Sequence, residues 1–334
     1  MRLNTPRAAL LGTIAISALA LAGCASSTPA VDDGTVRVVA STNVYGSLVE
    51  AIGGDLVTVT SLITSAAQDP HSFEASAQDQ LAISKADLVV ENGGGYDPFV
   101  DTLLKASSSN APVVNASEAS GLLEADHDHD DASDSSTPST SSGTDDGTGS
   151  DDDHAGHDHV EGFNEHIWYS FHGVEHVAEA IAEQLSALDA DNASTYQANL
   201  DAFTAQLETL EASAEALHAS TEGKGIAITE PVPLYLLEAA GFTNRTPEAF
   251  SEAIEEGTDV APAVLAKTLD LFDSSSVALL AYNSQTASSE TEQVRTAADD
   301  NGVPVVEFTE TMPDGADYVS WMTDNLSAIS AAVK

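Results

Sequence analysis

The chain has 334 residues, of which 42% are apolar, and this is enough to form one large domain or two smaller ones. Ten Lys and Arg residues against 54 Asp and Glu residues give a formal net charge of −44. Such a charge repels nucleic-acid phosphates and anionic lipid headgroups, so we exclude nucleic acid as a partner. The same field concentrates cations near the surface, although acidity alone also serves solubility.

The N-terminus has the pattern of an exported protein. Two arginines precede an apolar run from Ala8 to Ala22, which is short for a membrane span, so residues 1–23 are predicted to be a signal peptide. The sequence LAGC ending at Cys24 resembles a bacterial lipobox and predicts lipidation of Cys24; an ordinary export signal is the alternative. Residues 24–34 are polar and predict a flexible tether. No other apolar run reaches about 18 residues, so we expect membrane contact through the lipid anchor only.

Short β-rich runs alternate with helical patterns after the tether. This alternation predicts a parallel sheet with helices on both of its faces. The expected strands are Thr35–Ser41, Leu56–Ile63, Asp87–Glu91 and Ala111–Asn115, and the expected helices are Val44–Ile52, Ala77–Lys85 and Pro98–Ala106. These elements form the core of an N-terminal lobe, residues 35–190.

A second α/β series begins at Gly225 and predicts a C-terminal lobe, residues 221–334. Its expected strands are Gly225–Thr229, Val277–Tyr282 and Val303–Phe308. Its expected helices start at Leu234 and cover Pro247–Glu256, Pro262–Phe272, Thr291–Asp299 and Asp317–Val333. The fold class is therefore α/β, with two lobes that each contain a parallel sheet flanked by helices.

A single long helix is expected to join the lobes over residues 191–220. Its apolar residues alternate at spacings of four and three, which is the stripe of an amphipathic helix: Tyr196, Leu200, Phe203, Leu207, Leu210, Ala214 and Leu217. At 1.5 Å per residue this helix is about 40 Å long. We expect it to be rigid, whereas binding proteins that close about a hinge use short flexible connections.

Residues 122–162 differ in composition from the rest of the chain. The stretch from Leu122 to Glu165 contains 14 acids and five histidines but no Lys or Arg, so it is expected to stay disordered. The five histidines are His127, His129, His154, His157 and His159. Clustered imidazoles and carboxylates on a flexible loop predict weak, auxiliary binding of metal ions, and a solvated acidic linker is the alternative.

The remaining histidines are few enough to consider singly. His71 follows a predicted strand, where it is either a ligand in a crevice or a turn residue. His166 lies beside two aromatic residues and is either a ligand or a packed polar residue. His172 and His176 are spaced to share one helix face, but they lie in a first turn, where exposed polar residues are common. His218 is placed favourably for the helix dipole and needs no further role.

Five segments together resemble one known family: VVASTNVYGSLVEAIGGDLVTVTSLI, DPHSFEASAQDQLAISKADLVVENGGGYDPFVDTLL, NEHIWYSF, GIAITEPVPLYLLEAAGF and VPVVEFTETMPDG. The chain resembles the cluster A-I family, the lipid-anchored substrate-binding proteins of bacterial zinc and manganese ABC importers. The resemblance covers nearly all of residues 35–334. It implies two α/β lobes joined by a rigid long helix, a metal ion in the cleft between them, an ABC permease and its ATPase as partners, and an extracytoplasmic monomer.

The resemblance also implies a set of metal ligands. It makes His71 the first ligand and His166 the second. Glu230 falls where zinc-binding members usually have a third His and several manganese-binding members have Glu. The fourth position falls in AYNSQT, where Asn283 is the best candidate, with Gln285 or water as alternatives. A carboxylate before Pro231 that stabilises a helix N-terminus is the structural alternative for Glu230, and a satisfied turn amide is the one for Asn283.

We therefore expect a binding protein that captures a divalent transition metal and passes it to a permease. The His-rich insertion favours Zn²⁺, while Glu230 makes the site harder and favours Mn²⁺ as the alternative. A surface adhesin or a metal store would use the same features. A zinc hydrolase would need a general base, and Glu74 near His71 is the one candidate, but nothing polarises a scissile group, so we expect no enzyme.

Overall fold

The computed structural model describes residues 34–68, 70–123, 160 and 162–334. The predicted signal peptide, residues 1–23, lies outside the described residues, as does the predicted lipidation position Cys24. The five histidines of the His-rich segment also lie outside them: His127, His129, His154, His157 and His159. Residues 35–334 form one compact unit, and the fold described below is the fold of this unit.

The first sheet contains four parallel strands in the order β2-β1-β3-β4. They are β1 (Val36–Thr42), β2 (Val57–Ile63), β3 (Leu88–Glu91) and β4 (Val113–Asn115). The connecting helices are α1 (Asn43–Gly53), η1 (Gly54–Leu56), α2 (Ala77–Ile83), α3 (Pro98–Ser107) and α4 (Ala116–Ala119). Alternate residues bury opposite faces: Val38 packs in the cluster around α1, and Val39 packs in the cluster around α2 and α3. Both faces are therefore covered, as parallel sheets require.

The second sheet repeats this design with the order β6-β5-β7-β8, again with parallel pairs. Its strands are β5 (Gly225–Ile228), β6 (Thr243–Asn244), β7 (Leu280–Asn283) and β8 (Val305–Phe308). Its helices are α8 (Leu234–Ala239), α9 (Glu248–Glu255), α10 (Pro262–Asp273), α11 (Ser289–Asp300) and α12 (Tyr318–Ala332). The predicted fold class is confirmed. The two-residue strand β6 was not expected, because so short a segment carries no alternation of polar and apolar residues.

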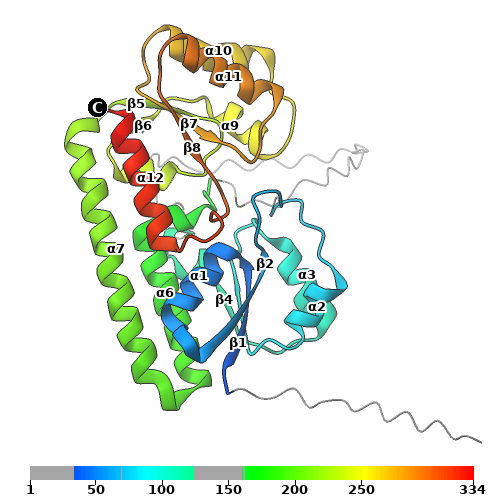
Figure 1. Cartoon of the computed structure of the whole chain (residues 1–334). Coiled ribbons are helices and arrows are strands. Elements are labelled where there is room, and N and C mark those ends of the chain that lie inside the picture. Colours follow the sequence, from blue (N-terminus) through cyan, green and yellow to red (C-terminus); the bar gives the residue numbers. More distant parts are fainter. Residues whose placement is uncertain (1–33, 69, 124–159, 161) are drawn as a thin grey trace, which may run out of the picture. The chain divides into compact units, whose positions relative to one another are not determined.

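Two long helices run side by side along the lobes (Figure 1). After η2 (Ile167–Tyr169) come α6 (Phe171–Leu188), η3 (Ala190–Asn192) and α7 (Ala193–Thr221). Helix α7 has 29 residues, and six of the seven residues in the predicted apolar stripe are buried, while Leu217 is partly exposed. No helix among the described residues, α7 included, is long and apolar enough to cross a membrane.

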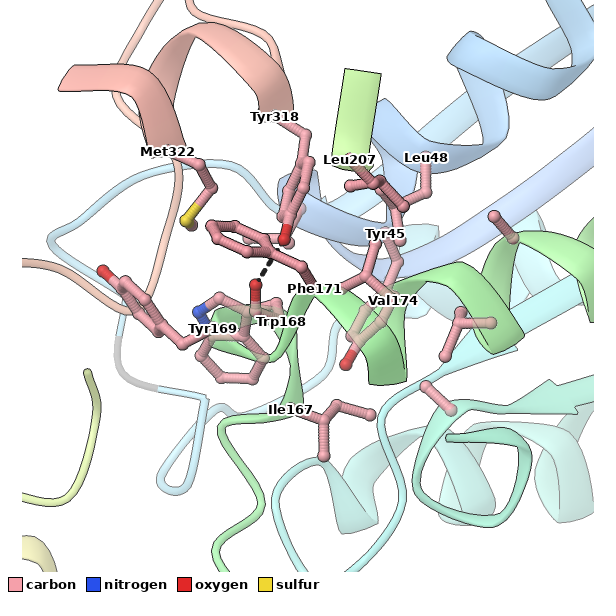
Figure 2. Packing of buried hydrophobic residues seen from close by; sticks show 14 of the residues in the cluster. Tyr45, Leu48, Ile167, Trp168, Tyr169, Phe171, Val174, Leu207, Tyr318 and Met322 are labelled. Carbon is pink, nitrogen blue, oxygen red and sulfur yellow. Dashed lines mark hydrogen bonds between the residues drawn. The ribbon is translucent and has the colours of Figure 1, made fainter. Parts of the chain in front are cut away.

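The last helix of the chain returns to the N-terminal lobe. The hydroxyl of Tyr318 donates to the carbonyl of Trp168 at 2.7 Å (Figure 2), and the backbone N–H of Tyr318 donates to Ser47 Oγ at 3.1 Å. Asn43 exchanges two hydrogen bonds with the backbone of Met312, at 2.8 and 3.1 Å. One hydrophobic cluster contains residues of both sheets and of α7. The two lobes therefore share a core, which opposes large movements of one against the other.

A glycine-rich turn follows β3. Gly93, Gly94 and Gly95 have φ values of 70°, 65° and 99°, which residues with a Cβ rarely adopt. The carboxylate of Asp97 accepts the backbone N–H groups of Asn92 and Gly93 at 2.7 and 2.8 Å. The Asp97 carboxylate therefore stabilises the turn.

Glu91 predicts a pH dependence of stability. Burial, followed by the charge of Asp97, raises the pKa of Glu91 from 4.5 to about 7, while a hydrogen bond from Asn115 opposes the rise. The folded state therefore holds a proton that the unfolded state releases, and the free energy of unfolding falls as pH rises through this window. We expect Glu91→Gln to stabilise the metal-free protein at pH 8 by at most about 3 kcal/mol, and by much less at pH 4.5. Denaturant titrations from pH 4.5 to 8.5 test this, and parallel profiles for the two proteins would contradict it.

Candidate metal centre

Three polar side chains lie where neighbouring strands of the second sheet end. Glu230 lies two residues after β5, Asn283 is the last residue of β7, and Glu310 lies two residues after β8. The carboxyl ends of parallel strands meet at one edge of a sheet, so the fold brings these side chains together. All three are nearly inaccessible, with 2–3% of their surface exposed.

Two histidines of the first lobe face this edge. His71 follows β2, and His166 immediately precedes η2. One ligand atom from each of His71, His166 and Glu310 lies within 4.8 Å of the other two. Among the described residues, this is the one group of three or more His, Cys, Asp or Glu side chains found close enough to hold a metal ion.

The tautomer of His166 follows from its neighbour Asn164. The Asn164 amide donates from Nδ2 to the carbonyl of Pro231 at 3.1 Å, so its Oδ1 is the atom that faces His166 Nδ1 at 2.8 Å. Because Oδ1 only accepts, His166 Nδ1 carries the proton and donates it. The lone pair of neutral His166 is therefore on Nε2, the form in which an imidazole coordinates a metal.

Asn283 joins the two buried carboxylates of the second lobe. Its Nδ2 donates to Glu230 Oε2 and, at 2.9 Å, to Glu310 Oε1. The opposite carboxylate oxygen of Glu230 accepts a hydrogen bond from the hydroxyl of Thr286. The amide nitrogen of Asn283 is thus engaged as a donor, and its Oδ1 accepts the backbone N–H of Gln285 at 3.0 Å. Asn283 therefore holds the carboxylates in place.

Gln285 is engaged at both ends of its amide. Its Oε1 accepts the backbone N–H groups of Glu310 and Thr311 at 2.6 and 3.2 Å. Its Nε2 donates to the carbonyl of Ala66, which belongs to the first lobe, at 3.1 Å. Gln285 therefore fixes the backbone beneath Glu310 and links the lobes beside the candidate site.

Two further carboxylates approach the histidines. Glu165 Oε1 lies 4.0 Å from His71 Nε2, and Glu255 Oε1 lies 3.8 Å from His166 Nδ1. Burial first, and then repulsion by Glu165, Glu230 and Glu310, raises the pKa of Glu255 to about 9. Three carboxylates, those of Glu165, Glu255 and Glu310, therefore lie close to the two imidazoles, and Asn283 joins Glu230 to Glu310. A bound cation would relieve the mutual repulsion of these carboxylates.

Tyr96 closes one side of the group. Its hydroxyl donates to Glu310 Oε2 at 3.3 Å, and its ring packs edge-on against His71 with centroids 4.9 Å apart. Burial, and then the charge of Glu310, raises the pKa of the Tyr96 hydroxyl well above 10. The phenol therefore stays neutral and acts as a donor that orients the carboxylate.

An acidic cleft lies beside His71. It has a volume of about 510 Å³ and is lined by residues of both lobes, among them four acids: Glu255, Glu256, Asp259 and Glu290. The negative field of such a cleft raises the local concentration of cations.

Sequence reasoning identified His71, His166, Glu230 and Asn283, and the structure brings all four to this region. It missed Glu310, Glu165 and Glu255. A signal for Glu310 is present in the sequence, because Glu310 follows the predicted strand Val303–Phe308 by two residues, as Glu230 follows its own strand almost directly. Glu165 and Glu255 have no such signal, since only tertiary packing turns them toward the histidines.

The family model described as "Zinc-uptake complex component A periplasmic", ZnuA, matches residues 38–332. The chain belongs to the ZnuA family. Membership confirms the resemblance found in the sequence. A ZnuA-family protein is the substrate-binding component of a metal ABC transporter, so the expectation of a binding protein and not an enzyme is also confirmed.

Individual relatives carry different metals in their names. The manganese ABC transporter substrate-binding lipoprotein ScaA of Streptococcus gordonii is 25% identical over 332 residues, which cover 93% of each chain. A zinc-bound ZnuA deletion mutant is 23% identical, with a TM-score of 0.66 over 90% of this chain and 98% of that chain. The periplasmic zinc-binding protein TroA of Treponema pallidum is 19% identical, with a TM-score of 0.68 over 90% and 99%. These solved structures are similar in fold.

The clamp formed by Asn283 predicts a metal-dependent rescue of stability. Asn283→Asp replaces the shared donor by another carboxylate, so it should destabilise the metal-free protein at pH 8 by roughly 3 kcal/mol. The loss should be smaller at pH 5.5, where carboxylates are more readily protonated, and saturating Zn²⁺ should restore most of it. Thermal unfolding with and without metal measures the effect. Asn325→Asp places a carboxylate at a buried position of α12 and is the control. Zinc should leave its destabilisation relative to the parent protein unchanged.

Proposed function

We propose that this chain captures one divalent transition-metal ion between its lobes and delivers it to an ABC permease driven by an ATPase. The proposed ligands are His71, His166, Glu230 and Glu310. The observation that carries the proposal is the approach of two imidazoles from the first lobe to within 4.8 Å of a carboxylate from the second. Two nitrogen and two oxygen donors suit first-row divalent ions.

Glu230 enters this set through Asn283. The same Nδ2 atom donates to Glu230 and to Glu310, so one oxygen of each carboxylate lies within hydrogen-bonding distance of that nitrogen. Asn283 is proposed as the residue that positions the two carboxylates, in place of the ligand role predicted from the sequence. Glu310 takes the fourth position.

We propose Zn²⁺ as the preferred ion. Imidazole nitrogens bind Zn²⁺ more tightly than Mn²⁺, and this site has two. The His-rich segment 122–162 also favours zinc, and it is proposed to bind additional ions weakly. Mn²⁺ is the second candidate, because Glu230 and Glu310 give the site as many oxygen donors as nitrogen donors, and oxygen ligands suit the harder ion.

The remaining features of the proposal concern where the protein acts. Cys24 is proposed to carry a lipid that holds the folded part outside the cytoplasm on the cell membrane, as a monomer. The net charge of −44 and the acidic cleft beside His71 favour the approach of cations from solution.

Removing a proposed ligand tests the site. His71→Ala, His166→Ala and Glu310→Gln should each weaken Zn²⁺ binding by more than about 100-fold, since even residues that only orient ligands contribute 10- to 100-fold. Competition titration with a chromophoric chelator measures affinity, and circular dichroism checks the metal-free fold. His218→Ala removes an exposed histidine from α7 and is the control. Parental affinity in any of the three folded variants would remove that residue from the ligand set.

Direct competition tests the choice of metal. At equal free concentrations we expect Zn²⁺ to displace Mn²⁺ from the parent protein, as measured by metal content after equilibrium dialysis. Glu230→His should widen the preference for zinc, because it exchanges an oxygen donor for nitrogen. A parent protein that retains Mn²⁺ under these conditions would overturn the zinc assignment and leave the transporter role intact.

A further inference from the structure

Two histidines lie together on the outer side of α6, away from the buried site. His172 is the second residue of α6 and is exposed, and His176 lies one turn later with 39% of its side chain exposed. Their Nε2 atoms are 3.3 Å apart. The inner side of the same helix is held in the core by Val174, Val177 and Ile181, so the backbone that presents the pair is fixed.

Glu179 determines which nitrogen of His176 is available. Its Oε2 lies 3.2 Å from His176 Nδ1, and an ionised carboxylate only accepts hydrogen bonds. His176 Nδ1 therefore carries the proton in the neutral ring, and the lone pair on Nε2 points toward His172. A carboxylate that orients a histidine in this way is the usual partner of a metal-binding imidazole.

The separation of the two nitrogens fits a metal ion. Nitrogens bound at about 2.0–2.1 Å to a tetrahedral ion lie about 3.3–3.4 Å apart, from the tetrahedral angle alone. The Nε2 atoms of His172 and His176 are already 3.3 Å apart in the structure without an ion. In the metal-free protein the contact is a hydrogen bond from His172 Nε2–H to His176 Nε2. To bind an ion, neutral His172 changes tautomer: its ring proton moves from Nε2 to Nδ1 and the lone pair on Nε2 becomes free, while α6 keeps its position.

We propose that His172 and His176 form a second, surface metal site, oriented by Glu179 and completed by water. Two imidazoles without a carboxylate ligand select the ions that prefer nitrogen, namely Zn²⁺, Ni²⁺ and Cu²⁺, over Mn²⁺. The start of a helix opposes a cation, and the carboxylates of Glu175 and Glu179 together with the net charge offset this. The site shares no ligand with the one between the lobes and does not depend on it.

Zinc titration of the ¹⁵N-labelled full chain, followed by imidazole NMR signals, tests the proposal. Resonances are assigned with His172→Gln and His176→Gln. The first equivalent of Zn²⁺ should leave both rings unchanged, and further Zn²⁺ should shift both with one common midpoint. In either single variant the remaining ring should need at least tenfold more zinc, because the second ligand no longer acts intramolecularly.

His218 is an internal control in the same spectra, since it is a single exposed histidine near the end of α7. Glu179→Gln should weaken the response of the pair several-fold while leaving His218 unchanged. The proposal is wrong if His172 and His176 respond at the zinc concentration that affects His218, if their midpoints differ, or if the single variants bind like the parent. Each of these results would mean that His172 and His176 are only hydrogen-bonded to each other and do not form a metal site.

Discussion

The mutual repulsion of four closely placed glutamates, three of them buried, is the constraint around which this protein is built. Glu165, Glu230, Glu255 and Glu310 come from four separated positions in the chain and from both lobes. Glu165, Glu255 and Glu310 approach the two histidines, and Asn283 joins Glu230 to Glu310. Without a cation, the repulsion between these carboxylates destabilises the folded state, and favourable interactions elsewhere in the fold must offset it. A shared core, a 29-residue helix and the hydrogen bonds of Asn283 hold the carboxylates in place.

A site in which the carboxylates are held close together before the ion arrives suits the proposed capture of a metal ion. A site that is assembled in advance loses little conformational entropy when the ion arrives, so binding free energy is not spent on ordering the chain. The raised pKa of Glu255 and the neutral phenol of Tyr96 limit the charge that remains when no ion is present. Because the lobes share one core, the ion is expected to alter charge and local order more than the distance between the lobes.

The sequence predicted the fold well because its signals are local. The stripe from Tyr196 to Ala214 follows helical periodicity, and the strands are short apolar runs between turns, so both can be read without tertiary information. The first two candidate ligands, His71 and His166, came from the family resemblance together with their rarity in the chain. Glu310 is brought beside Asn283 because β8 pairs with β7, and this pairing depends on strand order and not on local pattern. Glu255 approaches His166 only through the packing of α9.

The return of α12 to the first lobe has a consequence for the order in which the molecule is completed. Ribosomes produce the chain from its N-terminus, so α1 and α7 are made long before residues 318–332 exist to cover them. Until then, the pocket that receives Tyr318 between Ser47 and Trp168 lacks its occupant. The final packing of the N-terminal lobe therefore waits for the last twentieth of the polypeptide.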